Sequence, residues 1–186
     1  MKTPHILIIR FSAMGDIAMT VPIVYSFAKQ YPDVRISVLS RPFAQPFFQH
    51  LAPNVDFMAA DLKEEYKGFR GLNALYRRLV AKQFTAVADF HNVLRTRFLR
   101  LRFLLDGNSV AHINKHKQGK KRLCRKANKV FIQQPTSFQN YADVLEALGY
   151  PIKPEFTSIF PTEGGDLQLL PNIIGVKQPA ERWIGI

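Results

Sequence analysis

An isolated Gly-Asp pair stands near the start of this basic chain, within the stretch RFSAMGDIAMTVP at residues 10–22. The pair follows the apolar run HILIIRF (5–11) and precedes residues with helical spacing. Gly15 permits a tight turn from a strand into a helix, and Asp16 then lies near the positive end of that helix, where a carboxylate stays ionised. Such a carboxylate can act as a general base that takes a proton from a substrate hydroxyl. The alternative is an aspartate that only caps the helix.

Further polar residues stand at the ends of two apolar runs. Arg10 lies near the end of the first run, where its guanidinium can meet a phosphate or a sugar carboxylate, or can simply lie on the surface. His91 and Arg95 follow the run FTAVADF (84–90). His91 is a candidate substrate contact, with a purely structural histidine as the alternative. Because ligands bind at the carboxyl ends of parallel strands, we expect these residues at one mouth.

Positive charge is concentrated in one part of the chain. The formal net charge is +12, and residues 95–129 hold twelve lysines and arginines against one acid, Asp106. Within NKHKQGKKRLCRKANK (114–129) we expect an exposed loop or short helix beside the same mouth, and most of its charges are expected only to keep the protein in solution. The residues that we select as a phosphate-binding group are Lys120, Lys121, Arg122 and Arg125. A non-catalytic α/β module that binds nucleic acid or an anionic membrane through 95–129 is the alternative function.

Apolar runs alternate with helical patterns along most of the chain. This order predicts βαβ units and an α/β fold, an open parallel sheet with helices on both faces. Thr136 can cap the last helix, Gly149 ends it and Pro151 prevents its continuation. The expected strands are 5–11, 35–40, 55–60, 84–90 and 109–113, and the expected helices are 17–30, 43–51, 68–82, 93–105 and 137–148.

The chain is predicted to contain more than one structural part. We expect one domain over 1–150, a Pro- and Gly-rich linker over 151–171 and the start of a second domain over 172–186. The alternative is a last strand that returns to the same sheet. No apolar run is long enough to cross a membrane, and none resembles a signal peptide. The single cysteine, Cys124, excludes an intramolecular disulfide, so we expect a soluble cytoplasmic protein.

Several common nucleotide and metal motifs are missing. The Gly-Asp turn holds one glycine where a dinucleotide fingerprint needs three, and it lacks the Gly-Lys-Ser ending of a P-loop. The sequence contains no Asp-x-Asp pair of the kind that holds a metal in many sugar transferases. We therefore expect no metal site and no cofactor.

Three stretches of the sequence, ILIIRFSAMGDIAMTVPIV, ADFHNVLRT and EALGYP, together resemble the N-terminal half of the bacterial heptosyltransferases of lipopolysaccharide core synthesis, glycosyltransferase family nine. The resemblance implies the N-terminal Rossmann-like half of a GT-B enzyme, with the acceptor mainly on the first domain and the nucleotide-sugar mainly on the second. It implies that Asp16 is the catalytic base of a metal-independent inverting transfer. It also places Arg10, Ser12 and Gly15 beside the substrate.

The resemblance implies the partners as well. These are a nucleotide-sugar donor such as ADP-heptose, a phosphorylated lipid A-linked acceptor and the cytoplasmic face of an anionic inner membrane, with no nucleic acid. The isolated chain is expected to transfer little or no sugar. The sequence departs from the family at two positions, because Asn92 replaces the usual glycine and Met19 replaces a frequent histidine.

Overall fold

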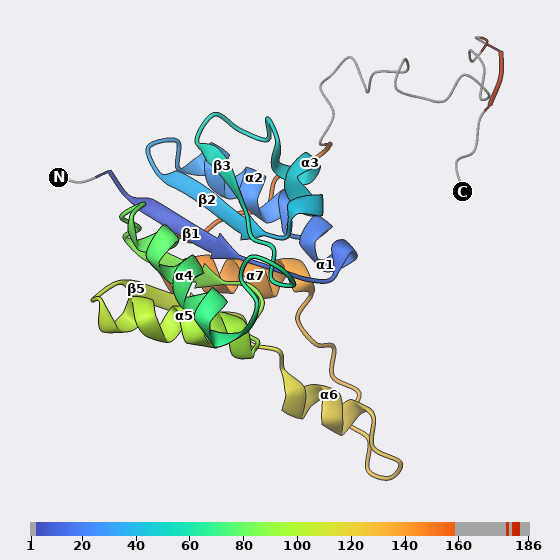
Figure 1. Cartoon of the computed structure of the whole chain (residues 1–186). Helices are drawn as coiled ribbons and strands as arrows, with labels where there is room; N and C mark the ends of the chain where they lie inside the picture. Colours follow the sequence, from blue (N-terminus) through green and yellow to red (C-terminus); the bar gives the residue numbers. More distant parts are fainter. Residues whose placement is uncertain (1–2, 159–177, 179, 183–186) are drawn as a thin grey trace. The chain divides into compact units, whose positions relative to one another are not determined.

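A five-stranded parallel sheet forms the centre of the protein in the computed structural model, which describes residues 3–158, 178 and 180–182. The strand order is β3-β2-β1-β4-β5, so the chain builds outward from β1 in both directions (Figure 1). The predicted open parallel sheet is confirmed. The strands are β1 (His5–Ile9), β2 (Arg35–Ser40), β3 (Val55–Ala59), β4 (Ala86–Asp89) and β5 (Ser109–His112).

The central strand β1 is buried along its whole length. Its side chains alternate between two apolar clusters, with Ile6 and Ile8 in one and Leu7 and Ile9 in the other. A strand that is covered on both faces has to be apolar at every position. This explains why HILII reads as a continuous run rather than as an alternating one.

Helices cover both faces of the sheet, as predicted. The cluster around Ile6 and Ile8 includes residues of α2 (Val21–Gln30) and α7 (Ser137–Glu146). The cluster around Leu7 and Ile9 includes residues of α4 (Gly68–Val80) and α5 (Leu94–Leu105). Figure 1 shows α4 and α5 next to each other on their face.

The helix expected over 17–30 is two helices, α1 (Met14–Ala18) and α2. Thr20 stands at the break, but its side chain does not cap α2. The Thr20 hydroxyl donates instead to the carbonyl oxygen of Ile17 at 2.7 Å, which ties the end of α1 to the start of α2. Pro22 lies in the first turn of α2, where its missing N–H costs no hydrogen bond.

One other expected helix is shorter than the pattern suggests, and the basic segment forms a short exposed helix, one of its two expected forms. The segment expected as a helix over 43–51 is a 3₁₀ turn, η1 (Pro42–Ala44), followed by the single turn of α3 (Gln45–Phe48). The basic segment contains α6 (Lys117–Leu123), none of whose residues is buried. In Figure 1 α6 and the loop after it project from the sheet and its covering helices.

Both ends of α7 follow the sequence signals. Thr136 Oγ1 accepts a hydrogen bond from the N–H of Gln139 at 3.2 Å, as the capping pattern predicts. The helix ends at Glu146, and Gly149 has a φ of +89°, a conformation that favours glycine.

The chain beyond α7 continues along α2. Gln30 Nε2 donates to the carbonyl oxygen of Lys153 at 2.6 Å, and the Glu155 N–H donates to Ser26 Oγ at 2.8 Å. A compact unit accordingly extends to Phe156. The predicted linker and second-domain start lie largely outside the described residues and stay predictions. No helix of the described part of the chain is long and apolar enough to cross a membrane.

Candidate functional site

The order of the strands changes direction between β1 and β4, which are neighbours in the sheet although β2 and β3 lie between them along the chain. Ligands of open parallel sheets bind at such a point, beside the carboxyl ends of the two strands. Ile9 is paired with Asp89 at this edge. The loop after β1 leads to Asp16, and the loop after β4 leads to Arg95, so the fold directs both predicted segments to one edge.

Asp16 lies in the first turn of α1, close to Arg10. The Arg10 Nη2 atom is 2.5 Å from Asp16 Oδ2, and the Ala13 N–H donates to the same oxygen at 3.3 Å. The aspartate therefore supports the start of α1, as the capping alternative proposed. No hydrogen bond to Oδ1 is found among the described residues, and 47% of the side chain is exposed. The carboxylate is held by one oxygen and can still accept a proton at the other.

Arg10 is buried, so its alternative assignment as a surface residue is wrong. Its Nη1 atom donates to the carbonyl oxygen of Phe90 at 2.6 Å, and its guanidinium lies 5.9 Å from the centre of the Tyr141 ring. Both amino groups are thus committed to Phe90 and Asp16. Its Nε atom is buried without a hydrogen-bond partner among the described residues. Arg10 joins the loop after β1 to the end of β4 and orients Asp16.

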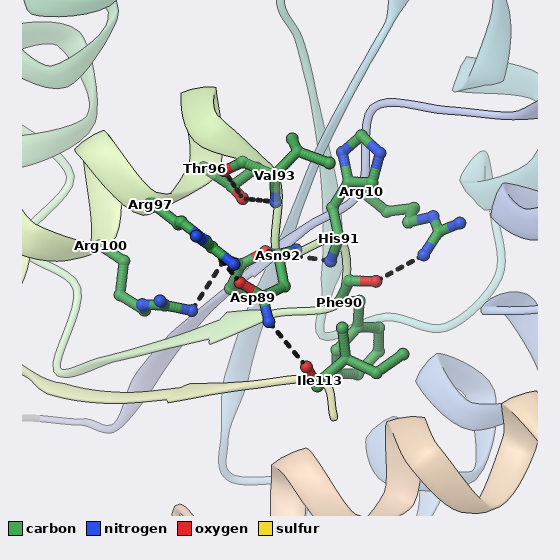
Figure 2. A network of polar contacts seen from close by, with 10 residues as sticks. All are labelled: Arg10, Asp89, Phe90, His91, Asn92, Val93, Thr96, Arg97, Arg100 and Ile113. Atoms are coloured by element: carbon green, nitrogen blue, oxygen red, sulfur yellow. Dashed lines mark hydrogen bonds and ion pairs between the residues drawn. The ribbon is translucent and has the colours of Figure 1, made fainter. Parts of the chain in front are cut away.

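A tight turn follows β4 and is organised by the buried carboxylate of Asp89 (Figure 2). Asp89 Oδ1 accepts the N–H groups of His91 at 2.9 Å and Asn92 at 2.8 Å. Its Oδ2 atom lies 3.1 Å from Arg100 Nη1, which compensates the buried charge. Asp89 shapes the loop and is inaccessible to a substrate.

Asn92 preserves the turn in which the family resemblance expects a glycine. Its φ is +48°, in the left-handed region that favours glycine and that asparagine tolerates better than most residues. Its side chain donates to the carbonyl oxygen of Ile113 at 3.0 Å and accepts from Arg97 Nε at 3.0 Å (Figure 2). The departure at Asn92 therefore leaves the backbone turn intact and ties it to β5 and α5.

His91 and Ser12 meet beside the aspartate. Ser12 Oγ lies 3.2 Å from His91 Nε2, whereas His91 Nδ1 is buried without a partner among the described residues. Burial, reinforced by the positive charges of Arg10 and Lys115, lowers the pKa of His91 to about 4. The imidazole is therefore neutral near pH 7, and it is suited to hydrogen bonding rather than to carrying charge. Both side chains line a hollow of about 210 Å³.

Two hollows open at this edge of the sheet. The smaller one is lined by Arg95 and Arg41 in addition to Ser12 and His91. The larger one has a volume of about 830 Å³, and its lining includes Arg97, Lys115 and Lys117. Burial, followed by repulsion from Arg10 and Lys117, lowers the pKa of Lys115. The described residues that line the larger hollow include no acid, so this hollow suits an anionic group.

The other predicted site residues are exposed and line neither of the two hollows. Gly15 is exposed within α1, it has no positive φ, and a Cβ there meets nothing within 4 Å. The tight turn that we expected of Gly15 is therefore not what this position requires. The residues of the selected basic group lie on α6 or just beyond it, exposed, and none lines either hollow: Lys120, Lys121, Arg122 and Arg125.

Sequence reasoning did not select three residues that the structure brings to the site. Lys115 and Lys117 belong to the same basic stretch as the selected group, but they lie nearer to β5 and line the larger hollow. Arg97 lies one turn into α5, where its spacing alone does not distinguish it from other arginines. Proximity to the end of the preceding strand is the signal that distinguishes the lysines. In the described part of the chain no three His, Cys, Asp or Glu residues gather as a metal site.

The sheet order and the helices on both faces define a Rossmann-like α/β fold. No protein-family model and no curated relative matches the sequence. Solved structures do match. One is a glycosyl transferase family 9 protein from Veillonella parvula, with a TM-score of 0.57 and 21% identity over 85% of this chain and 47% of that one.

Two structures of the E. coli heptosyltransferase WaaC match as well. The complex with ADP gives a TM-score of 0.56 at 18% identity, over 83% of this chain and 50% of the other. The complex with ADP-2-deoxy-2-fluoro heptose gives 0.58 at 16% identity, over 87% and 56%. The chain thus spans about half the length of the structures that it matches. At these identities the likeness is one of fold, and it agrees with the expected GT-B type of domain.

Proposed function

We propose that this chain forms the acceptor-binding half of a metal-independent inverting glycosyltransferase. The sugar is heptose or a related sugar, the donor is a nucleotide-sugar such as ADP-heptose, and the acceptor is the phosphorylated lipid A-linked core of lipopolysaccharide. The fold shared with glycosyltransferases supports the reaction class. The arrangement of Asp16 supports the assignment of the catalytic base.

The proposal depends mainly on one observation, the half-free carboxylate of Asp16. Oδ2 is held by Arg10 and by the backbone of Ala13, so the side chain has a fixed direction. Oδ1 makes no hydrogen bond among the described residues, and about half of the side chain is exposed. A general base requires this combination of a fixed position and an accessible oxygen.

In the proposed reaction an acceptor hydroxyl approaches Asp16 Oδ1. The carboxylate takes the hydroxyl proton while the hydroxyl oxygen forms a bond to the anomeric carbon of the donor sugar. The bond from that carbon to the diphosphate oxygen breaks, and the nucleoside diphosphate leaves with the electron pair. Attack from the face opposite the leaving group inverts the anomeric centre. We assign the donor to a second domain, as the family resemblance implies.

The acceptor is expected to contribute its own negative charge to binding. Arg97, Lys115 and Lys117 line the larger hollow and are suited to phosphate or carboxylate groups. Ser12 and the neutral His91 line the smaller hollow and are suited to sugar hydroxyls. On this proposal residues 1–186 alone bind the acceptor and transfer no sugar.

Acceptor binding by the chain tests this assignment. Kdo-lipid A in detergent is titrated into the wild-type protein and into the Arg97→Gln, Lys115→Gln double variant, with Arg35→Gln as a control at an exposed arginine of β2. We expect binding that survives moderate salt, at least tenfold weaker for the double variant and unchanged for the control. Equal affinity in all three proteins contradicts the proposal. Tight and salt-sensitive binding of arbitrary RNA supports the non-catalytic basic module instead.

A further inference from the structure

Helix α5 has two apolar stripes, and only one of them is buried. Leu99 and Phe103 face the core. A second stripe, which includes Phe98, runs along the same helix at spacings of four, three and four residues, and its leucines are exposed. These are Leu94 (85% exposed), Leu101 (55%) and Leu105 (74%). An ordinary surface helix is polar opposite its buried stripe, so this second stripe needs a separate explanation.

The exposed stripe continues onto α4. Phe69 is 73% exposed, and its ring packs against that of Phe98 at 4.6 Å between centroids. A groove of about 470 Å³ lies here, and its lining includes Phe69, Leu72, Leu94 and Leu101. The exposed apolar side chains therefore form one continuous surface across two helices.

The two helices that carry this apolar surface bear positive charge alone, while exposed acids stand just outside them at Glu65 and Asp106. Helices α4 and α5 together contain seven arginines and no aspartate, glutamate or lysine. Some of these arginines are engaged within the protein, such as Arg78 with Tyr66 and Arg100 with Asp89. Arg70 and Arg95 make no side-chain hydrogen bond or ion pair with the described residues.

The combination of exposed apolar side chains and arginines indicates what kind of partner this surface binds. A second copy of this surface presents the same seven arginines against a few flanking acids, so a self-complementary contact sets mostly like charges against each other. A nucleic acid neutralises the arginines but offers little apolar material to the leucines. An anionic phospholipid bilayer satisfies both, because leucine and phenylalanine enter the boundary of the acyl chains while arginines meet lipid phosphates.

We infer that the α4–α5 surface docks the protein on an anionic phospholipid membrane. This surface adjoins the candidate site, because Arg95 lines both the groove and the smaller hollow beside Ser12. A protein docked in this way presents that hollow close to the lipid headgroups. The inference does not depend on the proposed reaction, since it concerns bare lipid and requires no sugar.

Vesicle flotation tests the inference with the complete 186-residue chain. Vesicles of phosphatidylcholine alone are compared with vesicles that also contain phosphatidylglycerol. We expect binding only to the anionic vesicles, with at least a tenfold loss in Leu101→Ser, Leu105→Ser and about a fivefold loss per charge in Arg70→Gln and Arg95→Gln. Circular dichroism confirms that each variant is folded, and the replaced side chains are exposed.

Matched changes on the projecting segment serve as controls. Phe131→Ser, Ile132→Ser alters two exposed apolar residues, and Lys121→Gln, Arg122→Gln removes two charges of that segment. We expect these variants to retain most of the binding. Loss of binding in the controls but not in the α4–α5 variants overturns the inference, as does equal binding to neutral vesicles or a preference for RNA.

A fluorescent label reports the docking directly. The sequence has one cysteine, Cys124, so an environment-sensitive dye can be attached at a single position. In Leu105→Cys, Cys124→Ser the dye is expected to shift to shorter wavelength when anionic vesicles are added. A label at Cys124 itself is expected to shift less. The reverse order contradicts docking through α4 and α5.

Discussion

Arg10 connects Asp16 to the residue that follows the neighbouring strand β4. Its Nη2 atom is 2.5 Å from Asp16 Oδ2, and its Nη1 atom is 2.6 Å from the carbonyl oxygen of Phe90. The two contacts link the loop after β1 to the loop after β4 across the edge of the sheet. Arg10 thus acts on the proposed chemistry through Asp16, as a positioning residue. Its burial leaves it little freedom to bind a substrate phosphate.

Replacement of Arg10 is expected to reduce stability. Arg10→Met loses a charged hydrogen bond to a buried carbonyl, and we expect a loss of about 2 kcal/mol in the free energy of unfolding. The pair with the half-exposed Asp16 adds less than about 1 kcal/mol. Arg10→Lys keeps the charge but can make only one of the two contacts, so we expect a smaller loss. Urea unfolding measures both, and identical midpoints for the wild type and Arg10→Met contradict the role.

The turn after β4 provides a second prediction, at Asn92. Asn92→Ala loses the bonds to Ile113 and Arg97 and places alanine at a φ of +48°, so we expect a loss of about 2 kcal/mol. Asn92→Gly loses the same bonds but accepts the φ, so we expect about half that loss. Thermal unfolding gives the order. If the glycine variant is less stable than the alanine variant, the left-handed geometry is not what this position requires.

Stability is expected to fall with acidity because of His91. The folded-state pKa is lowered from 6.5 to about 4, mainly by burial. Below pH 6.5 His91 binds a proton in the unfolded chain but not in the folded protein. The free energy of unfolding therefore falls as the pH drops from 6.5 to about 4. We expect the free energy of unfolding of His91→Gln to decrease by about 2 kcal/mol less than that of the wild type over this pH range. Parallel stability curves for both proteins between pH 7 and pH 4 rule out the assignment.

Two glycines in helices are expected to respond oppositely to alanine. A Cβ at Gly15 meets nothing within 4 Å, so Gly15→Ala should keep or raise stability by up to about 1 kcal/mol. A Cβ at Gly71 lies 2.3 Å from the backbone carbon of Tyr66, so Gly71→Ala must displace the chain before α4 and should lower the melting temperature. Acceptor binding by the stable Gly15→Ala protein then shows whether a substrate uses the open space there. Equal melting temperatures for the two variants contradict the packing at Gly71.

Most of the fold follows from local sequence patterns. β1 and the strands beside it are apolar because both faces of the sheet are covered, and α7 carries a capping threonine and a terminating glycine in sequence. Thr20 and Pro22 are typical of a helix start and α2 does begin there, but the helical pattern continues upstream, so 17–30 was expected as one helix. The hydroxyl of Thr20 turns back to the carbonyl oxygen of Ile17, three residues earlier, and this local bond replaces a cap on α2.

The site was harder to predict than the fold. Asp16 and His91 could be selected because they follow buried strands, and the fold directs both to one edge of the sheet. The burial of Arg10 depends on Phe90 and Tyr141, which are far away in sequence. The lysines that line the larger hollow are Lys115 and Lys117 rather than those of the denser group that follows, because the rest of α6 projects away from the sheet (Figure 1).

The transfer rate of an Asp16→Asn variant tests the central proposal most directly. Asparagine keeps the size of the side chain and can still pair with Arg10, but it cannot accept the hydroxyl proton. The assay uses the complete translation product that contains this chain, with ADP-heptose and Kdo-lipid A, and Glu64→Gln serves as a control at an exposed acid. We predict that kcat falls by about 10² to 10⁴-fold in Asp16→Asn with acceptor affinity retained, while the control is unchanged. An unchanged kcat in Asp16→Asn contradicts the role of Asp16 as the base.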